Sequence, residues 1–299
     1  MQSQTSIHER AAADRFSQAD CRKSTASLRT TREPTLAAIE SDILMRQLVI
    51  NADDLGFDTD TLSATTRLME QGRITSATIL TGFPASEAAM RFARDHAKDF
   101  SFGLHFNIAE GRPAGAEPVP SLIGKGGEFH APISQRLRAL TGALRRKDLV
   151  NELTAQLSIL ADHGVTPTHL DSHGHLHKFP PVLKAMLPVM QRFGIRRIRR
   201  AQTSYDNQRA YNRLIDGHCN RAFAASGCDM TDHFFNTRTQ DKSWFDQFVA
   251  ALPTGKAELG VHPGQAEDWR RAEMQALDDP EFFTKLSSHQ IGLISYHDI

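Results

Sequence analysis

From Met45 onward, short apolar runs alternate with amphipathic stretches at the helical period. The apolar runs lie at residues 47–52, 76–82, 100–107, 167–172, 195–201, 256–264 and 290–296. The helical stretches between them lie at residues 59–72, 86–97, 147–163, 181–193 and 279–288. Strands separated by helices pair in parallel, and such sheets carry helices on their outer faces. The alternation therefore predicts an α/β fold, and residues 202–235 are harder to assign.

A single barrel-like (β/α) domain over residues 45–299 is the economical interpretation. Barrels of this class use about 250 residues as one unit, and the chain has 299. No internal repeat or linker divides this part of the sequence. In such barrels the chemistry lies at the carboxyl ends of the parallel strands, so the residues after each apolar run are the candidates for function.

Residues 1–44 have a different character. They are polar, rich in Ser, Thr, Ala and Arg, and contain no sustained apolar period. We expect a disordered extension. A targeting arm is less favoured because acidic residues are scattered through the segment, and transit peptides avoid them. A true start of the protein at Met45 stays open as an alternative.

Composition excludes several classes of partner. Lys plus Arg and Asp plus Glu number 35 each, and no basic tract is long enough to follow a phosphate backbone, so no nucleic acid is expected. The run "RRIRR" at 196–200 is an anion patch, a strand end or a solvated face. Three cysteines without a C-x-x-C pair argue for a reducing, cytoplasmic location, and no apolar window is long enough to span a membrane. The sequence does not decide whether the protein forms a homodimer.

Acidic residues and histidines recur at the ends of the predicted strands. Independent strands have no other reason to deliver such side chains to one edge of a barrel, which makes the recurrence stronger than any single motif. Two imidazoles and one carboxylate from different strands would leave positions open for water and substrate, as catalytic metal sites do. The residues concerned are Asp53, Asp54, His105, Asp171, His173 and His262.

The stretch "THLDSHGHLHKFP", residues 168–180, contains four histidines and one aspartate. Imidazole and carboxylate are ligand types that divalent metals favour, so the cluster predicts a metal site. If the segment were extended, His173, His175 and His177 would face the same way, and the sequence does not choose among them. His169 has the other parity, inside the strand, and is expected to be a core histidine.

Asp53 and Asp54 invite two interpretations. In an extended strand they point to opposite sides, so both reach one pocket only if the strand ends there and Gly56 lets the chain turn. One could then bind a metal while the other acts as a base. Alternatively, "DDLG" is the N-cap and turn that opens the next helix, a role that aspartate fills well.

Four motifs carry a resemblance to a known family. In order and spacing, "LVINADDLG", "GLHFNIAEGRP", "PTHLDSHGHLH" and "ELGVHPG" resemble the YdjC/ChbG-like carbohydrate deacetylase family across residues 45–299. Further similar pieces are "VPSLIGKGGEF", "RAEMQALDDPEF" and "GLISYHDI". The family is similar to NodB-type polysaccharide deacetylases, with a barrel-like α/β fold of the glycoside hydrolase/deacetylase type and one divalent metal.

The resemblance implies a role for each strand-end residue. Asp54, His105 and His173 would hold the metal, Asp53 would be the general base, and His262 the general acid that protonates the leaving amine. Amide hydrolysis needs an activated water, an electrophile for the developing oxyanion and a proton for the departing nitrogen, so this set is chemically sufficient. Magnesium is the first expectation for the metal from the family, and zinc is the alternative from the ligand types.

The remaining residues of the cluster have supporting roles in this interpretation. Asp171 would accept a hydrogen bond from a ligand imidazole. His175 is expected beside the ligands or facing the substrate, and His177 as a structural hydrogen-bonding group. Gly174 stands where some members of the family carry another histidine, which could alter the local loop. Within the Gly- and Pro-rich loop over residues 111–132, the stretch "RPAGAEPVPSLIGKGG" is expected to form a lid that shapes the substrate site.

The expected function is metal-dependent removal of an acetyl group from an N-acetylated sugar or short oligosaccharide, so the expected partner is a small carbohydrate. A metallo-phosphoesterase or a sugar isomerase on the same scaffold, or a metal-binding protein without turnover, are the alternatives. Parts of the family are associated with chitin-derived disaccharides and with hopanoid biosynthesis. The sequence does not choose between these substrates.

Overall fold

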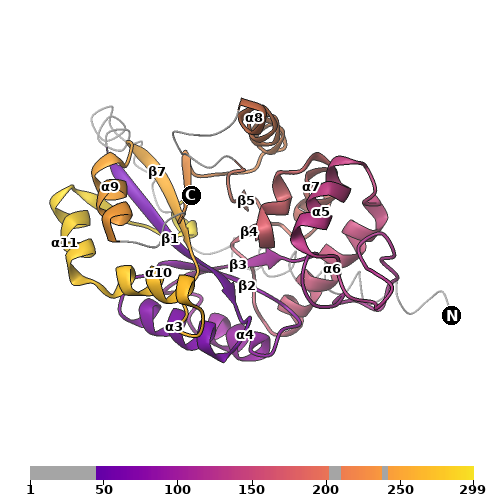
Figure 1. The fold of residues 1–299 in the computed structure, drawn as a ribbon, viewed down its shortest axis with the longest axis horizontal. Helices are drawn as coiled ribbons and strands as arrows, with labels where there is room; N and C mark the ends of the chain where they lie inside the picture. The colour runs from indigo at the N-terminus through magenta and orange to yellow at the C-terminus, as the bar shows by residue number, and fades with distance from the viewer. Residues whose placement is uncertain (1–44, 202–209, 238–241) are drawn as a thin grey trace, which may run out of the picture.

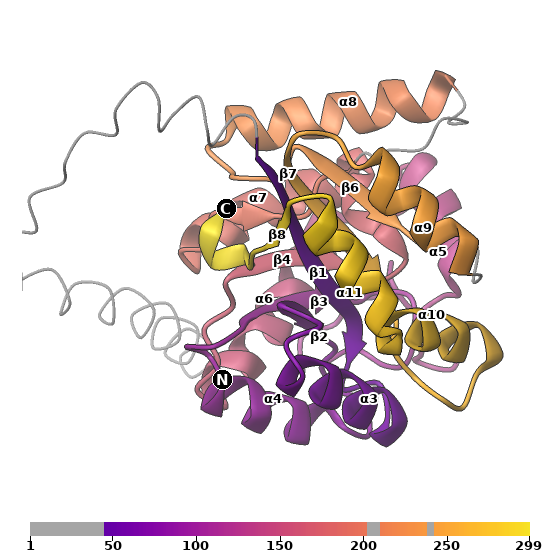
Figure 2. The ribbon, with the colours of Figure 1, turned by 90° about the vertical axis from the view of Figure 1, so that its left-hand side faces the viewer.

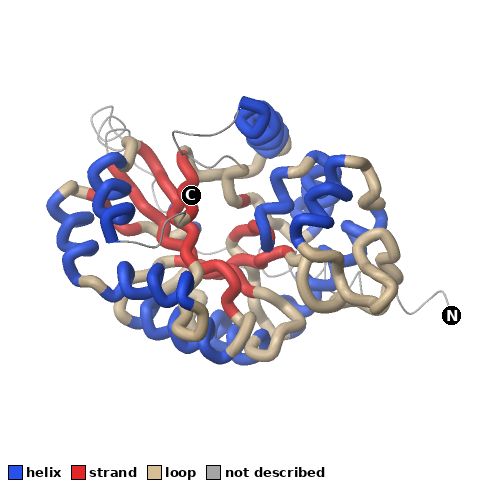
Figure 3. Tube along the Cα trace, in the orientation of Figure 1, coloured by secondary structure: helices blue, strands red, loops and turns tan. Residues whose placement is uncertain are grey.

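The structure is a computed structural model that describes residues 45–201, 210–237 and 242–299, so the predicted extension over residues 1–44 lies outside the described residues. A parallel sheet forms its centre (Figure 3). Its strands are β1 (Arg46–Leu55), β2 (Ser76–Ile79), β3 (Ser101–Phe106), β4 (His169–Ser172), β5 (Arg197–Ile198), β6 (His233–Asn236), β7 (Gly255–Val261) and β8 (Ile291–Leu293).

The strand order shows how the sheet curls. It runs β5-β4-β3-β2-β1-β7-β6, with β8 paired to the first residues of β1. Asp229, just before β6, forms a parallel bridge with Arg197 of β5, which brings the two outer ends of this order toward each other. The result is a curled, incompletely closed barrel (Figure 1). The predicted barrel-like α/β fold is confirmed.

Helices pack around the outside of the curled sheet (Figure 1), and all five predicted helical stretches are present. Among the described residues, no helix combines the length and the apolar character that a membrane span requires. The helices are α3 (Thr59–Glu70), α4 (Ser86–Asp95), α5 (Pro132–Leu140), α6 (Arg146–Asp162), α7 (Pro180–Arg192), α8 (Ala210–Ala225), α9 (Lys242–Ala251), α10 (Asp268–Asp278) and α11 (Pro280–Ser288), with short 3-10 turns η1 (His173–Lys178) and η2 (Tyr296–Asp298).

The two faces of the sheet differ in polarity. Side chains that face the helices, such as Leu48, Ile50 and Leu104, belong to the hydrophobic core. The alternate positions on the same strands point into the barrel and are polar although fully buried, as Asn51 on β1 and Glu258 on β7 show. The barrel interior is therefore a polar layer, and the apolar core lies between sheet and helices.

Close approach inside the barrel requires a glycine on β3. A Cβ atom built on Gly103 would lie 2.7 Å from the His169 carbonyl oxygen and 2.8 Å from its ring. His169 uses that space to stack on Tyr296, with ring centroids 3.6 Å apart and an interplanar angle of 6°. Its Nε2 lies 3.2 Å from Asn51 Oδ1. His169 is thus a buried, hydrogen-bonded residue of the barrel interior.

Candidate functional site

Asp54, His105 and His173 converge at the carboxyl ends of β1, β3 and β4. Asp54 Oδ1 lies 3.3 Å from His105 Nε2 and 3.0 Å from His173 Nδ1. One ligand atom from each residue lies within 4.8 Å of the others. Asp54 and His105 are buried, while His173 keeps 18% of its side chain exposed. One carboxylate and two imidazoles with one accessible side could hold a divalent metal.

A bulge in β1 lets both adjacent aspartates reach the same pocket. The pairing of β1 with β2 shifts register between Ala52 and Leu55, and Asp54 has a positive φ of 61°. A bulge re-aims a side chain that a regular strand would send to the opposite face. The N-cap of α3 is Asp58, whose side chain accepts a hydrogen bond from the Thr61 N–H. The helix-cap interpretation of Asp53 and Asp54 is therefore wrong.

Arg199 holds Asp53 from inside the barrel. Its two terminal nitrogens lie 2.7 and 2.6 Å from Asp53 Oδ2 and Oδ1, which makes the pair bidentate. Burial would raise the pKa of Asp53, but the Arg199 guanidinium outweighs it and holds that pKa well below its usual range. Asp53 is consequently ionised at neutral pH.

Two further carboxylates share the same guanidinium. Asp171 Oδ2 lies 2.7 Å from Arg199 Nη1, and Glu258 Oε1 lies 2.8 Å from its Nε. Arg199 is completely buried and also lies over the Phe234 ring, 4.7 Å from its centroid. Of the interpretations of "RRIRR", the strand end is correct for Arg199, but its role as the central cation of the barrel was not predicted.

Asp171 also orients His105. Its Oδ1 lies 2.7 Å from His105 Nδ1, and Thr78 donates a hydrogen bond to its Oδ2. Burial alone would lower the pKa of His105, but Asp171 and then Asp54 raise it to about 10. With Nδ1 bound to Asp171, Nε2 is directed at Asp54. This is the contact expected of Asp171.

Glu110 and Arg270 complete the charges around Asp54. Glu110 Oε2 lies 3.3 Å from His173 Nε2, and Arg270 Nη2 donates to Asp54 Oδ2 at 2.7 Å. Burial would lower the pKa of His173, but its bonds to Asp54 and Glu110 raise it to about 9. The Arg270 guanidinium lies 4.4 Å from the ring centroid of Trp269. Neither Glu110 nor Arg270 was predicted.

His262 lies on the other side of Asp53 and is backed by a glutamate. Its Nε2 is 3.8 Å from Asp53 Oδ2, and its Nδ1 is 3.4 Å from Glu273 Oε2. The backbone N–H of His262 donates to the same oxygen at 2.7 Å, and Thr237 donates to the other oxygen. Burial would lower the pKa of His262, but Glu273 outweighs it and raises that pKa above its ordinary value. Glu273 on α10 was not predicted.

The histidine cluster is not extended. Residues 173–178 form the turn η1, in which Gly174 and His175 have positive φ angles of 65° and 55°. The parity argument for His173, His175 and His177 therefore does not apply. Glycine is suited to the first of these positions, because a side chain there would be strained. This conformation sends the three imidazoles to different surroundings.

The remaining histidines of the turn have separate partners. His175 Nε2 lies 3.0 Å from Asn236 Nδ2, and the residue lines the cleft above the Asp/His cluster. His177 is buried, with Nδ1 2.7 Å from Ser172 Oγ. His173 is the member of the turn that contacts Asp54.

A cleft of about 400 Å³ opens over the cluster. Its walls bring together β1, β3, η1, α5 and α10. Trp269 lines it, together with Phe57 and Arg136. Aromatic and arginine side chains beside a polar floor suit a ligand with both apolar faces and hydroxyl groups.

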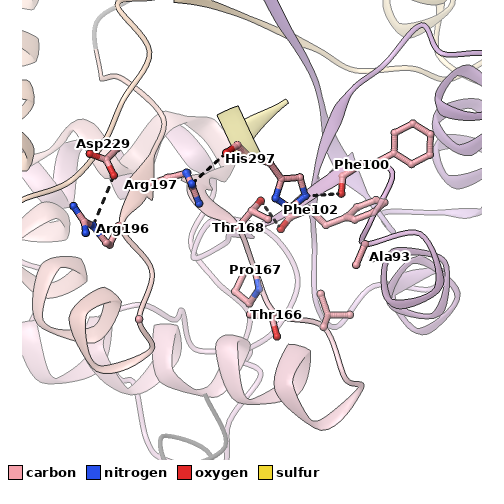
Figure 4. Close-up of a pocket in the computed structure, with 13 residues that line it drawn as sticks. Ala93, Phe100, Phe102, Thr166, Pro167, Thr168, Arg196, Arg197, Asp229 and His297 are labelled. Atoms are coloured by element: carbon pink, nitrogen blue, oxygen red, sulfur yellow. Dashed lines mark hydrogen bonds and ion pairs between the residues drawn. The ribbon is translucent and has the colours of Figure 1, made fainter. Parts of the chain in front are cut away.

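A larger cavity lies at the opposite end of the sheet. It measures about 560 Å³ and is lined by residues that precede or begin strands, including Thr166, Thr168 and Arg197 (Figure 4). Arg197 is bound to the Ile299 carbonyl, and His297 Nε2 to the Phe100 carbonyl. No residue of the Asp/His cluster lines this cavity, so the smaller cleft is the candidate active site.

Fold and site together define an α/β barrel protein with a candidate catalytic centre at the carboxyl ends of its strands. The chain belongs to the family of YdjC-like proteins, whose sequence model matches residues 47–288. A carbohydrate deacetylase from Geobacillus stearothermophilus is 30% identical over 269 residues, which cover 85% of this chain and 98% of that protein. A human carbohydrate deacetylase is 33% identical over 153 residues, which cover 50% of this chain and 47% of that protein.

A solved structure supports the fold. A protein from Enterococcus faecalis V583 that is assigned to cellobiose-phosphate cleavage superposes with a TM-score of 0.71 at 21% identity. The alignment covers 85% of this chain and 98% of that protein. At this identity the likeness concerns the fold alone.

Proposed function

We propose that this protein is a metal-dependent carbohydrate N-deacetylase that hydrolyses the acetamide group of an N-acetylated sugar or short oligosaccharide. The observation that carries the proposal is the arrangement of Asp54, His105 and His173 within one cleft beside Asp53 and His262. The relatives named carbohydrate deacetylase support it. An amide needs both a base and an acid for hydrolysis, and a site built only to bind a metal needs neither.

Asp54, His105 and His173 would hold the divalent metal. Three protein ligands leave positions open for water and for the acetyl oxygen, as in catalytic rather than structural sites. When bound, such an ion lowers the pKa of a water and polarises a carbonyl group, so that a weakly basic carboxylate suffices as the base. Magnesium is our first candidate, and two imidazole donors make zinc the alternative.

Asp53 would accept the proton of the attacking water. Arg199 keeps this carboxylate ionised and fixes both of its oxygens. His262, with a raised pKa and its Nε2 directed toward Asp53, would carry the proton that the leaving amine requires. Because Asp53 and His262 are neighbours that line one cleft, the proton that Asp53 takes from water is balanced by the proton that His262 gives to the leaving nitrogen.

Release of acetate from a panel of N-acetylglucosamine oligosaccharides tests this function. We expect acetate with added metal and none after chelation. Release of phosphate from sugar phosphates, or isomerisation of free sugars, in place of acetate would replace the proposal with the corresponding activity. Tight metal binding without turnover of any of these substrates would indicate a binding protein.

His105→Ala and His173→Ala are each expected to lose most of the bound metal, because each removes one of three ligands. His169→Ala is expected to keep the metal and to lose about 2–4 kcal/mol of stability, since it removes the ring that stacks on Tyr296 and leaves a cavity. Metal analysis and denaturant unfolding of the purified variants measure both effects. If His173→Ala keeps its full metal content and His175→Ala loses the metal, His173 has been wrongly assigned as the ligand.

In a plot of kcat against pH, Glu273→Gln is expected to move the alkaline limb to lower pH. Glu273 raises the pKa of His262, so its neutral replacement lowers that pKa, and the protonated acid is then lost at a lower pH. The profile is measured with saturating metal and substrate. Glu281→Gln, an exposed glutamate on α11, serves as the control and should leave the limb in place. A reduced kcat with an unmoved limb would mean that Glu273 only supports the fold.

A further inference from the structure

Helix α5 exposes an apolar stripe. Ile133, Leu137 and Leu140 are 79%, 62% and 60% exposed. Within the described part of the chain, the other exposed large apolar residues are isolated ones, Met45 and Leu214. At about 100° per residue, the three side chains of α5 lie within roughly 60° of one another on the helix. Exposed apolar side chains that gather in this way mark an interaction surface.

The stripe borders the mouth of the candidate active site. Pro132 and Arg136 lie on the neighbouring face of α5 and line the cleft, while Gln135 is buried on the face that packs against the protein. Arg136 Nη2 donates to the Gly174 carbonyl at 3.0 Å, which ties α5 to the turn that carries His173. In Figure 1, α5 lies beside α7 at the rim of the fold. Whatever covers the stripe therefore lies next to the cleft.

Positively charged residues accompany the stripe along the chain. The segment 129–147 contains five cations and no acidic residue, although the whole chain has a formal net charge of zero. Arg138 is half-buried and donates to the Ser121 carbonyl, and the other four are exposed. The five are Arg136, Arg138, Arg145, Arg146 and Lys147.

A recess between α6 and α7 has the same combination of apolar and positively charged side chains. It measures about 530 Å³ and combines an apolar lining from Val150, Pro188 and Val189 with the cations Arg146, Lys147 and Arg192. An anionic group on an apolar stem matches both parts of this lining. Phospholipids have that combination of charge and hydrocarbon.

We propose that the α5 surface, residues 132–147 with its apolar stripe and its cations, docks on an anionic lipid bilayer. A basic amphipathic helix binds such a surface by placing its apolar side chains between the lipid headgroups and its cations against their phosphates. A second copy of the chain is a less suitable partner. A symmetric interface would bring these cations close to the same cations of the other copy, and like charges repel. Together with the proposed deacetylase function, docking would present the cleft to sugars carried by lipids.

Vesicle co-sedimentation of the full chain tests the docking. We expect binding to vesicles of phosphatidylcholine with phosphatidylglycerol, no binding to phosphatidylcholine alone, and weakening by salt. Ile133→Glu combined with Leu137→Glu should weaken binding by about 10- to 100-fold. Arg145→Ser and Arg146→Ser should each weaken it by about fivefold. Leu214→Glu is the matched control, since it charges a residue of α8 that is 74% exposed, and it should bind like the wild type.

Two results would overturn the proposal. One is a wild-type protein that does not bind anionic vesicles. The other is an equal loss of vesicle binding in the α5 variant and in Leu214→Glu. Dimerisation in solution that the α5 variant abolishes would instead make this surface an interface between copies. Acetate release from a soluble oligosaccharide should be unchanged in the α5 variant, which shows that it folds. Vesicle binding without acetate release from any substrate would refute the proposed function and leave the docking intact.

Discussion

Asp53→Asn is expected to keep its metal and its fold while turnover falls by about 10²- to 10⁴-fold, the usual contribution of general acid-base catalysis. The amide has nearly the same shape as the carboxylate, but it cannot accept a proton from water at neutral pH. Arg199 keeps Asp171 and Glu258 as partners in this variant, so its charge remains compensated. The loss should therefore appear in kcat rather than in stability.

Asp54→Asn is the matched control, because it makes the same chemical change at the adjacent residue. It should lose metal affinity, since a neutral amide oxygen is a poorer donor to a divalent cation than a carboxylate. Acetate release under saturating metal, together with metal analysis, separates the two variants. Wild-type turnover in Asp53→Asn would end its assignment as the base, and metal loss in that variant would make it a ligand.

Arg199→Met is expected to destabilise the protein by about 3–5 kcal/mol, the usual cost of removing one partner from a buried ion pair. Three buried carboxylates would lose their shared cation and become protonated or hydrated. Methionine retains much of the volume, so the loss measures charge more than packing. Denaturant unfolding of the two proteins at neutral pH gives the difference in the free energy of unfolding.

Arg196→Met provides the comparison for this experiment. Its side chain is 74% exposed and makes a loose ion pair with Asp229 at 3.7 Å, so the change should stay within about 0.5 kcal/mol. Equal stability of Arg199→Met and the wild type would show that the carboxylates are neutral or solvated in the folded protein. That outcome would also remove the reason for the low pKa of Asp53.

The sequence predicted the parts of this site that lie at strand ends. Asp54 and His173 follow recognisable apolar runs, His105 lies near the end of another, and the parallel sheet brings the ends of such runs to one edge whatever the details of packing. Strand periodicity and the direction of the chain predicted which side chains meet at this edge. The choice of Asp54, His105 and His173 among them, and the place of Asp171 beside a ligand imidazole, depended on the resemblance to the family.

The charged residues that support the site were not predicted, because tertiary packing alone buries them. Arg199 stands in a run of arginines of which Arg196 is exposed, and local sequence does not tell the two apart. Glu273 and Arg270 lie on α10, a helix outside the helical stretches predicted from the sequence. Long side chains reach the cleft from a helix, whereas a strand pattern reports only the residues of the strand itself. A glutamate at an inward strand position, such as Glu258, is the signal that could have pointed to a buried arginine.

The polar interior of the barrel implies that its residues cannot change independently during evolution. Asp53, Asp171 and Glu258 share Arg199, so loss of one carboxylate leaves the cation two partners, whereas loss of the cation affects all three carboxylates at once. Side chains in one such network show coupling energies of about 0.5–3 kcal/mol in double-mutant cycles. Arg199→Met, which is harmful alone, should thus become more tolerable after a partner such as Glu258 has been replaced by a neutral residue, and lineages that repack this interior are expected to replace the carboxylates before the arginine.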